Sequence, residues 1–430
     1  MDYSKSYQFS WARNPNWSQY CSKSEEIWQH LKDTAKKFGL EKYIKYNHRV
    51  ESATWDEDSG LWKLSILGPD GSLLSDSCEV LVNGGGILNS WKYPDVPGID
   101  VFQGKLMHSA RWDQQYDFAG QDSCVGPADK IFTMLIIVAK NVVSFLRSPV
   151  WVTTGFGAKY AGPNGTNFHY SEEQKTKFTK DPALYHRYCR DLEGELNKRF
   201  ALQRPEIFKE LVTKMMTERL GHHPQLTEYL IPDFALGCRR MTPGSGYLES
   251  LIQPNVQVVC QSVERITENG VVDGFSVHHE ADAIICASGF DTSFSPHFQV
   301  TGRNGRDLQK TFGDFPKARM GIMAEGFPNL FHFLGPNSPH TRYMFQVIDK
   351  LQVENIKCFD PKPECIHDLF NHTHELMKRL TWSAACNSWF KNGKKHGPVT
   401  AIWPGSRLHY FEAMDRPRYE DYNITYRSNN

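Results

Sequence analysis

Two apolar segments that run directly into glycine constrain the fold of this chain more than any other feature. The first is Val80-Leu-Val-Asn-Gly-Gly-Gly86 and the second is Asp282-Ala-Ile-Ile-Cys-Ala-Ser-Gly289. About 200 residues with an interrupted α/β pattern lie between them. This arrangement predicts one dinucleotide-type domain with a second domain inserted into it. Any buried strand can end in glycine, so the two segments alone are equally consistent with two ordinary buried strands.

Periodicity places helices and strands around these segments. Residues 25–38 carry apolar side chains every three or four positions, which predicts an amphipathic helix that ends at Gly39. Residues 363–380 predict a second amphipathic helix, and residues 165–230 are charged and helical in pattern. The expected strands are residues 44–55, 61–67 and 78–82, which form a small β-meander, and then residues 141–146, 252–263 and 274–278.

Charge and hydropathy exclude several classes of protein. The 430 residues contain 49 basic and 49 acidic side chains, so no net charge attracts a nucleic acid. The longest apolar stretch, residues 131–146, includes Lys140 and Asn141 and is too short and polar to span a membrane. The polar residues 1–11 do not resemble a signal peptide, so we expect a reducing, cytoplasmic location.

Ten cysteines occur in the chain without a Cys-x-x-Cys pair. In a reducing compartment they are expected to be buried thiols rather than disulfides. The absence of Cys-x-x-Cys also argues against a zinc ribbon or a dithiol redox site, and no metal site is expected.

Residues 102–113 carry the most specific motif in the sequence. They read Phe-Gln-Gly-Lys-Leu-Met-His-Ser-Ala-Arg-Trp-Asp and resemble the fingerprint F-x-G-x-x-x-H-x-x-x-W-[P/D] of Baeyer–Villiger monooxygenases. The matching positions are Phe102, Gly104, His108, Trp112 and Asp113. In that family the segment links two nucleotide-binding domains and performs no chemistry itself. His108 considered alone is equally consistent with a hydrogen-bonded linker histidine.

The resemblance extends over nearly the whole chain. The further matching segments are residues 6–10, 14–18, 53–57, 81–86, 94–98, 284–291, 327–331 and 335–339. The resemblance implies an α/β fold with two nested Rossmann-like dinucleotide-binding domains. An FAD-binding domain would comprise residues 1–113 and 281–430. An NADP-binding domain would occupy residues 114–280, with a helical insertion at about residues 165–232.

The same resemblance implies an activity. Such enzymes use NADPH, FAD and O2 to convert a ketone into an ester or lactone. Residues 402–409 and 417–421 resemble fungal relatives that act in secondary-metabolite biosynthesis. Gly237-Cys-Arg-Arg240 resembles the family's G-x-[K/R]-R segment, which makes Arg240 the candidate catalytic residue and Arg239 a candidate NADP contact. A fixed cation is what developing negative charge on a substrate oxygen requires. Without the family context, the two arginines would be interpreted as a salt-bridging surface pair.

Other cofactor contacts are implied residue by residue. Arg147 and Ser148 match a strand end that holds the 2′-phosphate of NADPH, for which a guanidinium is well shaped. Trp389 matches a tryptophan near the nicotinamide, although a core aromatic is an equally good interpretation. The remaining candidates are flavin or adenine contacts at Asp2, Tyr7, Val50 and Met344.

Two departures from the family pattern concern the phosphate-binding turns. The family opens with G-x-G-x-x-G, whereas the first 60 residues here contain only Gly39 and Gly60, so the first β-α-β unit is expected to be missing. The second glycine motif is reduced to Gly126 followed by Pro127. A catalytically impaired remnant or a non-catalytic binding module is therefore the alternative. A flavin disulfide reductase is disfavoured because Cys-x-x-Cys is absent.

Overall fold

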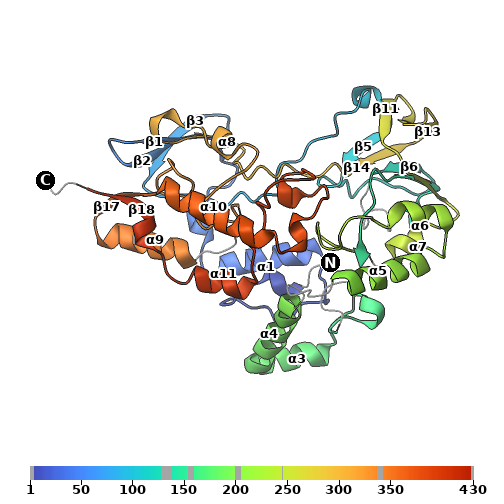
Figure 1. Ribbon diagram of the computed structural model, residues 1–430, viewed down its shortest axis with the longest axis horizontal. Helices are drawn as coiled ribbons and strands as arrows, with labels where there is room; N and C mark the ends of the chain where they lie inside the picture. The colour runs from blue at the N-terminus through green and yellow to red at the C-terminus, as the bar shows by residue number, and fades with distance from the viewer. Residues whose placement is uncertain are drawn as a thin grey trace. The chain divides into compact units, whose positions relative to one another are not determined.

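The computed structural model describes residues 4–126, 135, 137–153, 159–198, 205–244, 246–336 and 342–427. The chain forms two compact units that are interleaved along the sequence (Figure 1). Unit 1 comprises Met1–Ile44, Lys92–Leu236 and Met241–Ser288, and unit 2 comprises Lys45–Trp91, Gly237–Arg240 and Gly289–Asn430. Each unit is a group of residues that contact one another densely, which says nothing about cofactors. The boundaries of the FAD-binding and NADP-binding domains therefore remain predictions.

Unit 1 is built on a five-stranded parallel sheet in the order β10-β7-β6-β14-β5. Its strands are β5 Lys105–His108, β6 Asp122–Val125, β7 Asn141–Phe145, β10 Val256–Val259 and β14 Ala283–Cys286. Two of the three inner strands, β7 and β14, are almost completely buried runs of mostly apolar residues, the pattern of a parallel sheet covered on both faces. Because the strands are parallel, their carboxyl ends meet at one edge, where ligands of such sheets bind.

Helices of unit 1 form two groups, each with its own apolar core. Helices α5 Pro205–Arg219, α6 Pro224–Leu230 and α7 Tyr247–Ser250 share a buried cluster with the sheet. Helices α3 Glu172–Lys180 and α4 Pro182–Lys198 pack together and form an aromatic cluster with residues 17–27 at the start of the chain. The remaining elements are α1 Ser24–Lys37, the pair β8 Val152–Thr153 and β9 Thr242–Pro243, and the antiparallel strands β11 Val263–Thr267, β12 Gly270–Asp273 and β13 His278–Glu280.

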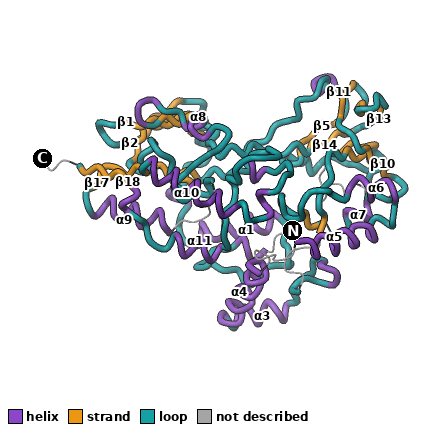
Figure 2. The backbone as a smooth tube through the Cα atoms, viewed as in Figure 1, coloured by secondary structure: helices purple, strands orange, loops and turns teal. Residues whose placement is uncertain are grey.

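Unit 2 contains three small sheets. The first has the order β15-β1-β2-β3, with β1 Arg49–Asp56, β2 Leu61–Leu67, β3 Leu73–Cys78 and β15 Gln299–Thr301. The second is the parallel pair β4 Leu81–Asn83 and β16 Leu330–His332. The third is the antiparallel pair β17 Ile356–Pro361 and β18 Tyr422–Tyr426, which lies beside α9 (Figure 2). The helices are α8 Leu308–Phe312, α9 Arg342–Val353, α10 Pro363–Met377 and α11 Arg407–Ala413.

Most predicted elements are present with small shifts in their ends. The predicted helix 25–38 corresponds to α1, strand 61–67 corresponds to β2, and strand 141–146 corresponds to β7. The predicted strand 252–263 instead contains the whole of β10 and the first residue of β11, separated by a bend. Within the described residues, no helix is long and apolar enough to cross a membrane.

Two predicted strands are wrong. Residues 78–82 do not continue the meander, because Leu81 donates its backbone N–H to Asn329 and thereby begins the pairing of β4 with β16. Residues 274–277 form a turn rather than a strand, and strand β13 begins only at His278. The Asp273 carboxylate accepts the backbone N–H groups of residues 275 and 277, and Ser276 adopts a left-handed φ of 62°.

Candidate functional site

The fingerprint segment is built into the edge of the sheet of unit 1. Its strand β5 pairs with β14 in the register Lys105↔Ala283 through His108↔Cys286. Gly104 comes immediately before β5, and a Cβ atom there would lie 2.4 Å from the backbone oxygen of Asp282. Glycine is therefore required for the close approach of these two strands. Phe102 packs against the apolar cluster on the same side of the sheet.

His108 connects the fingerprint to the second strand-and-glycine turn. Its side chain is fully buried, and burial lowers its pKa, so the ring is neutral at pH 7. The Nδ1 atom accepts the backbone N–H of Ala110 at 3.0 Å, which leaves the proton on Nε2. Nε2 lies 3.1 Å from Ser288 Oγ, and that hydroxyl donates to the backbone oxygen of Lys92 at 2.7 Å. A relay of hydrogen bonds thus joins residues 92, 108 and 288.

Two contacts fix the end of the fingerprint. The ring of Trp112 stacks on Phe118 with centroids 5.3 Å apart. Asp113 accepts a hydrogen bond from Lys105 Nζ at 2.5 Å, and this bond, together with the backbone N–H of Gln115, lowers the pKa of the carboxyl group. The contacts of the five matching residues therefore serve packing and geometry around one strand, and their role as a linker remains a prediction.

Arg147 and Ser148 follow the carboxyl end of β7, near the centre of the sheet. The preceding residue is held in place, because Leu146 donates its N–H to Val259 and accepts a hydrogen bond from the Tyr229 hydroxyl at 2.6 Å. Arg147 and Ser148 are both exposed, and Arg147 makes no hydrogen bond or ion pair within the described part of the chain. A guanidinium available at this edge can bind a phosphate group.

Gly126 occupies the turn after β6, where the second glycine motif is expected. It donates its N–H to Ile285 at 3.1 Å, and a Cβ atom there would lie 3.3 Å from the backbone nitrogen of Ala287. Pro127 and the residues up to 134 lie outside the described residues, so the predicted degradation of this motif remains a prediction.

In unit 2, the parallel strands β4 and β16 end side by side. Asn83 Nδ2 lies 3.3 Å from His332 Nδ1, and Phe333 donates its N–H to the backbone oxygen of Asn83. His332 is buried, and burial lowers its pKa to about 4. Its Nε2 atom has no hydrogen-bond partner among the described residues, which is unusual for a buried polar group. Gly86 has no heavy atom within 4 Å of where its Cβ would be.

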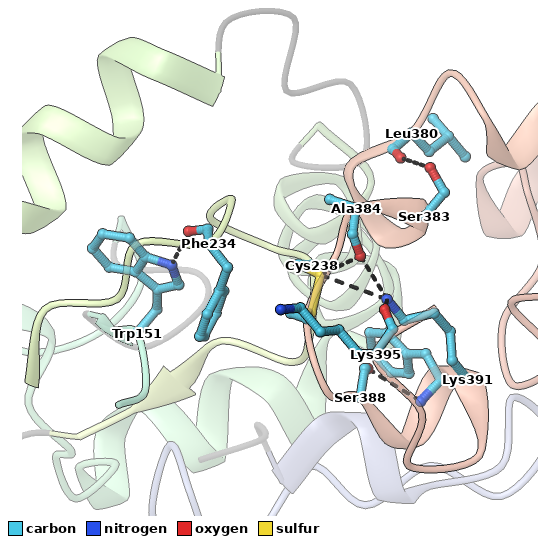
Figure 3. The surroundings of a disulfide bond; sticks show 11 residues. Trp151, Phe234, Cys238, Leu380, Ser383, Ala384, Ser388, Lys391 and Lys395 are labelled. Carbon is cyan, nitrogen blue, oxygen red and sulfur yellow. Dashed lines mark hydrogen bonds between the residues drawn. A yellow bond between two sulfur atoms is a disulfide. The ribbon is translucent and has the colours of Figure 1, made fainter. Parts of the chain in front are cut away.

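The candidate arginines lie in a short segment tied to a distant loop. Cys238 forms a disulfide with Cys386, with Cα atoms 6.4 Å apart (Figure 3). The expectation that all the cysteines are thiols is therefore wrong for this pair, because the fold brings two residues 148 positions apart to bonding distance. Arg239 is half-buried, and burial lowers its pKa, whereas Arg240 is exposed.

The other predicted contacts are spread over both units. Tyr7, at the end of η1 Ser4–Tyr7, belongs to unit 1 and is partly exposed. In unit 2, Val50 lies in β1 and is half-buried, Met344 is buried in the core under α9, and Trp389 packs beside Phe390. Asp2 lies outside the described residues. The assigned roles of all the site residues remain predictions.

Sequence reasoning missed several polar residues around the site. Ser288, Lys92 and His332 do not stand out in the sequence as residues that would contact one another or a cofactor. Lys391 and Cys386 were also missed, because their contacts with Cys238 depend on the long-range fold.

The fold is that of an α/β protein whose parallel strands end at the kind of sheet edge where dinucleotides bind. No family model matches the chain. The FAD-binding monooxygenase tazF of Aspergillus terreus is 36% identical over 451 residues, which cover 99% of this chain and 80% of the relative. A Baeyer-Villiger monooxygenase of Streptomyces coelicolor is 29% identical over 97% of this chain and 82% of that protein.

A solved structure gives the same result for the fold. Cyclohexanone monooxygenase from Rhodococcus sp. Phi1, bound to NADP+, superposes with a TM-score of 0.82 at 21% identity, covering 98% of this chain and 89% of that one. The chain belongs to the FAD-binding monooxygenase family. The predicted family and α/β fold class are confirmed.

Proposed function

We propose that this chain catalyses a Baeyer–Villiger oxidation, in which NADPH and O2 are consumed and a ketone becomes an ester or lactone. The observation that carries the proposal is the fingerprint segment in its folded form. Its glycine permits the close strand approach, and its histidine is buried in a relay to the second strand-and-glycine turn. The named relatives are monooxygenases, so the alternative of a non-catalytic module is not favoured.

NADPH fits the residues at the end of β7. Arg147 is exposed and lacks a partner within the described residues, and the Ser148 hydroxyl is exposed next to it. This pair would bind the 2′-phosphate, with the arginine supplying charge-assisted hydrogen bonds. NADPH supplies the reducing electrons when it is bound.

FAD fits this chain only in part. The carboxyl ends of β4 and β16, with the unpartnered Nε2 of His332 and the open turn at Gly86, match the edge at which parallel sheets bind ligands. However, this sequence contains no G-x-G-x-x-G, so the backbone cradle for a pyrophosphate is not present in it. We therefore propose FAD as the cofactor and assign no step of the reaction to residues around the flavin.

Arg240 is the proposed catalytic residue. Its guanidinium is exposed, so it can stabilise negative charge on the oxygen of a substrate carbonyl. We propose that the ketone is a secondary metabolite, on the basis of the C-terminal resemblance, and that the enzyme works in the cytoplasm.

A cofactor titration followed by a ketone panel tests the proposal. We expect a bound-flavin absorption spectrum on adding FAD, NADPH consumption, and an ester or lactone detected by mass spectrometry. Arg240→Ala should keep the flavin spectrum and lose the product by about 100-fold, the range seen when one charge-stabilising group is removed. Arg240→Lys is the matched control and should keep part of the activity. NADPH consumption without any ester from a broad panel of ketones would contradict the reaction.

A further inference from the structure

The disulfide joins two segments of unit 2 that lie 148 positions apart in the sequence. Cys238 lies in residues 237–240, a piece of unit 2 that is flanked on both sides by chain belonging to unit 1. Cys386 lies between η7 Thr381–Ser383 and η8 Trp389–Lys391. Both cysteines are buried, with 0% and 4% of their surface exposed. The bond is therefore the covalent restraint on the four residues that include the candidate arginines.

A buried lysine lies beside this bond (Figure 3). Lys391 is 1% exposed, and its Nζ atom is 4.0 Å from Cys238 Sγ. Nζ donates hydrogen bonds to the backbone oxygens of Ala384 at 2.5 Å and Lys395 at 2.9 Å. No carboxylate pairs with Lys391 among the described residues, and burial lowers its pKa. A buried ammonium without a counter-ion is unfavourable, so a thiolate at Cys238 would be stabilised here.

We propose that Cys238 and Cys386 form a reversible redox tether that positions the Arg239–Arg240 segment, and that Lys391 promotes the tether by stabilising the Cys238 thiolate. A disulfide that serves only as a permanent brace needs no cation beside one sulfur. The positioning of Arg240 rests on the proposed function, whereas the tether itself does not.

The redox chemistry balances with hydrogen peroxide as the oxidant. The Cys238 thiolate attacks one peroxide oxygen, the O–O bond breaks, and a sulfenic acid and hydroxide result. The Cys386 thiol then attacks that sulfur, the S–O bond breaks, and water leaves. Two thiols and one peroxide thus give one disulfide and two waters, with two electrons passing from sulfur to oxygen. A dithiol reductant returns both electrons, and Cys238 leaves as the thiolate beside Lys391.

The first experiment needs no cofactor and examines the bond. Peptide mass mapping of the purified chain under non-reducing conditions should show a 238–386 cross-link that disappears with a phosphine reductant and returns with hydrogen peroxide. In the reduced protein, alkylation of Cys238 by iodoacetamide at pH 7 should be about tenfold slower in Lys391→Met than in the wild type, because less thiolate is present. Lys395→Met is the matched control, since that side chain is exposed, and it should change nothing.

The second experiment examines positioning. Trypsin cleaves after arginine, so the rate of cleavage after Arg239 and Arg240 measures how often this segment opens. We expect about tenfold faster cleavage in the reduced wild type and in Cys386→Ser, with other cleavage sites unchanged. Cys260→Ser, which removes a free thiol, is the control for cysteine replacement. Because the reduced wild type carries no substitution, a misfolded variant cannot decide the result.

Several outcomes would overturn the proposal. If no 238–386 cross-link forms after peroxide treatment, the proposed tether does not exist. If Cys238 is alkylated at the same rate in Lys391→Met as in the wild type, the lysine does not stabilise the thiolate. If trypsin cleaves after Arg239 and Arg240 at the same rate in the reduced and the oxidised protein, the disulfide does not position this segment. If the tether passes these tests but no ketone is oxidised in either redox state, the proposed function fails and the tether stands. If activity is present, reduction should lower kcat for the ketone.

Discussion

The buried ammonium of Lys5 is subject to two opposing effects, loss of hydration and attraction to aromatic rings, and a substitution can show which is stronger. Its side chain is 5% exposed, and the ammonium has no hydrogen-bond acceptor among the described residues. Four aromatic rings surround it, two from α4, one from α3 and that of Tyr170, at 4.3 to 5.2 Å from Nζ to the ring centroids. Burial disfavours the charged form, and the faces of the rings favour it. The perturbation is Lys5→Met, which keeps the length of the side chain and removes the charge.

The magnitudes favour burial as the stronger effect. Burial lowers the pKa of Lys5 from 10.5 to about 8, which corresponds to about 3 kcal/mol against the charged form at about 1.36 kcal/mol per pKa unit. A desolvated cation–π interaction contributes about 2 kcal/mol in the opposite direction. We therefore expect Lys5→Met to raise the free energy of unfolding at pH 7 by about 1 kcal/mol.

The pH dependence follows from the sign of the shift. Because the pKa is lower in the folded state, the unfolded chain binds more protons between pH 8 and 10.5, and stability rises with pH over this range. Between pH 8 and 10.5, the free energy of unfolding of the wild type should rise by about 1 to 3 kcal/mol relative to that of Lys5→Met. Burial raises the pKa of the Tyr170 and Tyr185 hydroxyls, so the unfolded chain loses these protons first and stability falls from about pH 10 upward. This fall is common to the wild type and Lys5→Met, so it cancels in the comparison of the two.

The assay is urea unfolding at pH 7 and pH 10.5 for the wild type, Lys5→Met and the control Lys36→Met, whose side chain is exposed on α1. The control should follow the wild type at both pH values. A wild type that loses stability relative to Lys5→Met on going to pH 10.5 would show that the rings outweigh burial, and the reasoning would be refuted.

Three further predictions concern the site in unit 1. Gly104→Ala should lower the free energy of unfolding by about 1 to 3 kcal/mol in urea, because its Cβ would lie 2.4 Å from a backbone oxygen, while Gly194→Ala, in open space on α4, should raise it by about 1 kcal/mol. Arg147→Ala should raise the KM for NADPH by about tenfold or more and leave the KM for NADH unchanged, as steady-state kinetics would show; an equal rise for both would argue against a 2′-phosphate contact. Because burial lowers the pKa of His108, the unfolded chain protonates first as the pH falls, so stability should be lost below about pH 6.5; a thermal melt of His108→Asn with the same pH dependence as the wild type would contradict this.

Local pattern and motif spacing were sufficient to predict several elements. Strand β2 and helix α1 carry clear periodicity, and the fingerprint residues lie together because they are close in sequence around the short strand β5. The prediction failed where long-range pairing decides the structure. Residues 78–82 are split because Leu81 pairs with a segment about 250 positions away, which no local pattern reveals. The partner of Cys238 is hidden for the same reason, since ten cysteines permit many pairings.

The interleaving of the two units has a consequence for how the chain folds during its synthesis. Strand β4 finds its partner β16 only when the ribosome has added residues 249 positions further along, and β5 waits in the same way for β14. Neither unit can close its sheet before most of the chain has been made. The nascent protein therefore exposes unpaired strand edges for many seconds at about 5 to 20 residues per second. Such a chain depends on chaperones to reach its native state, and its yield in a foreign host should rise when translation and folding are slowed by low temperature.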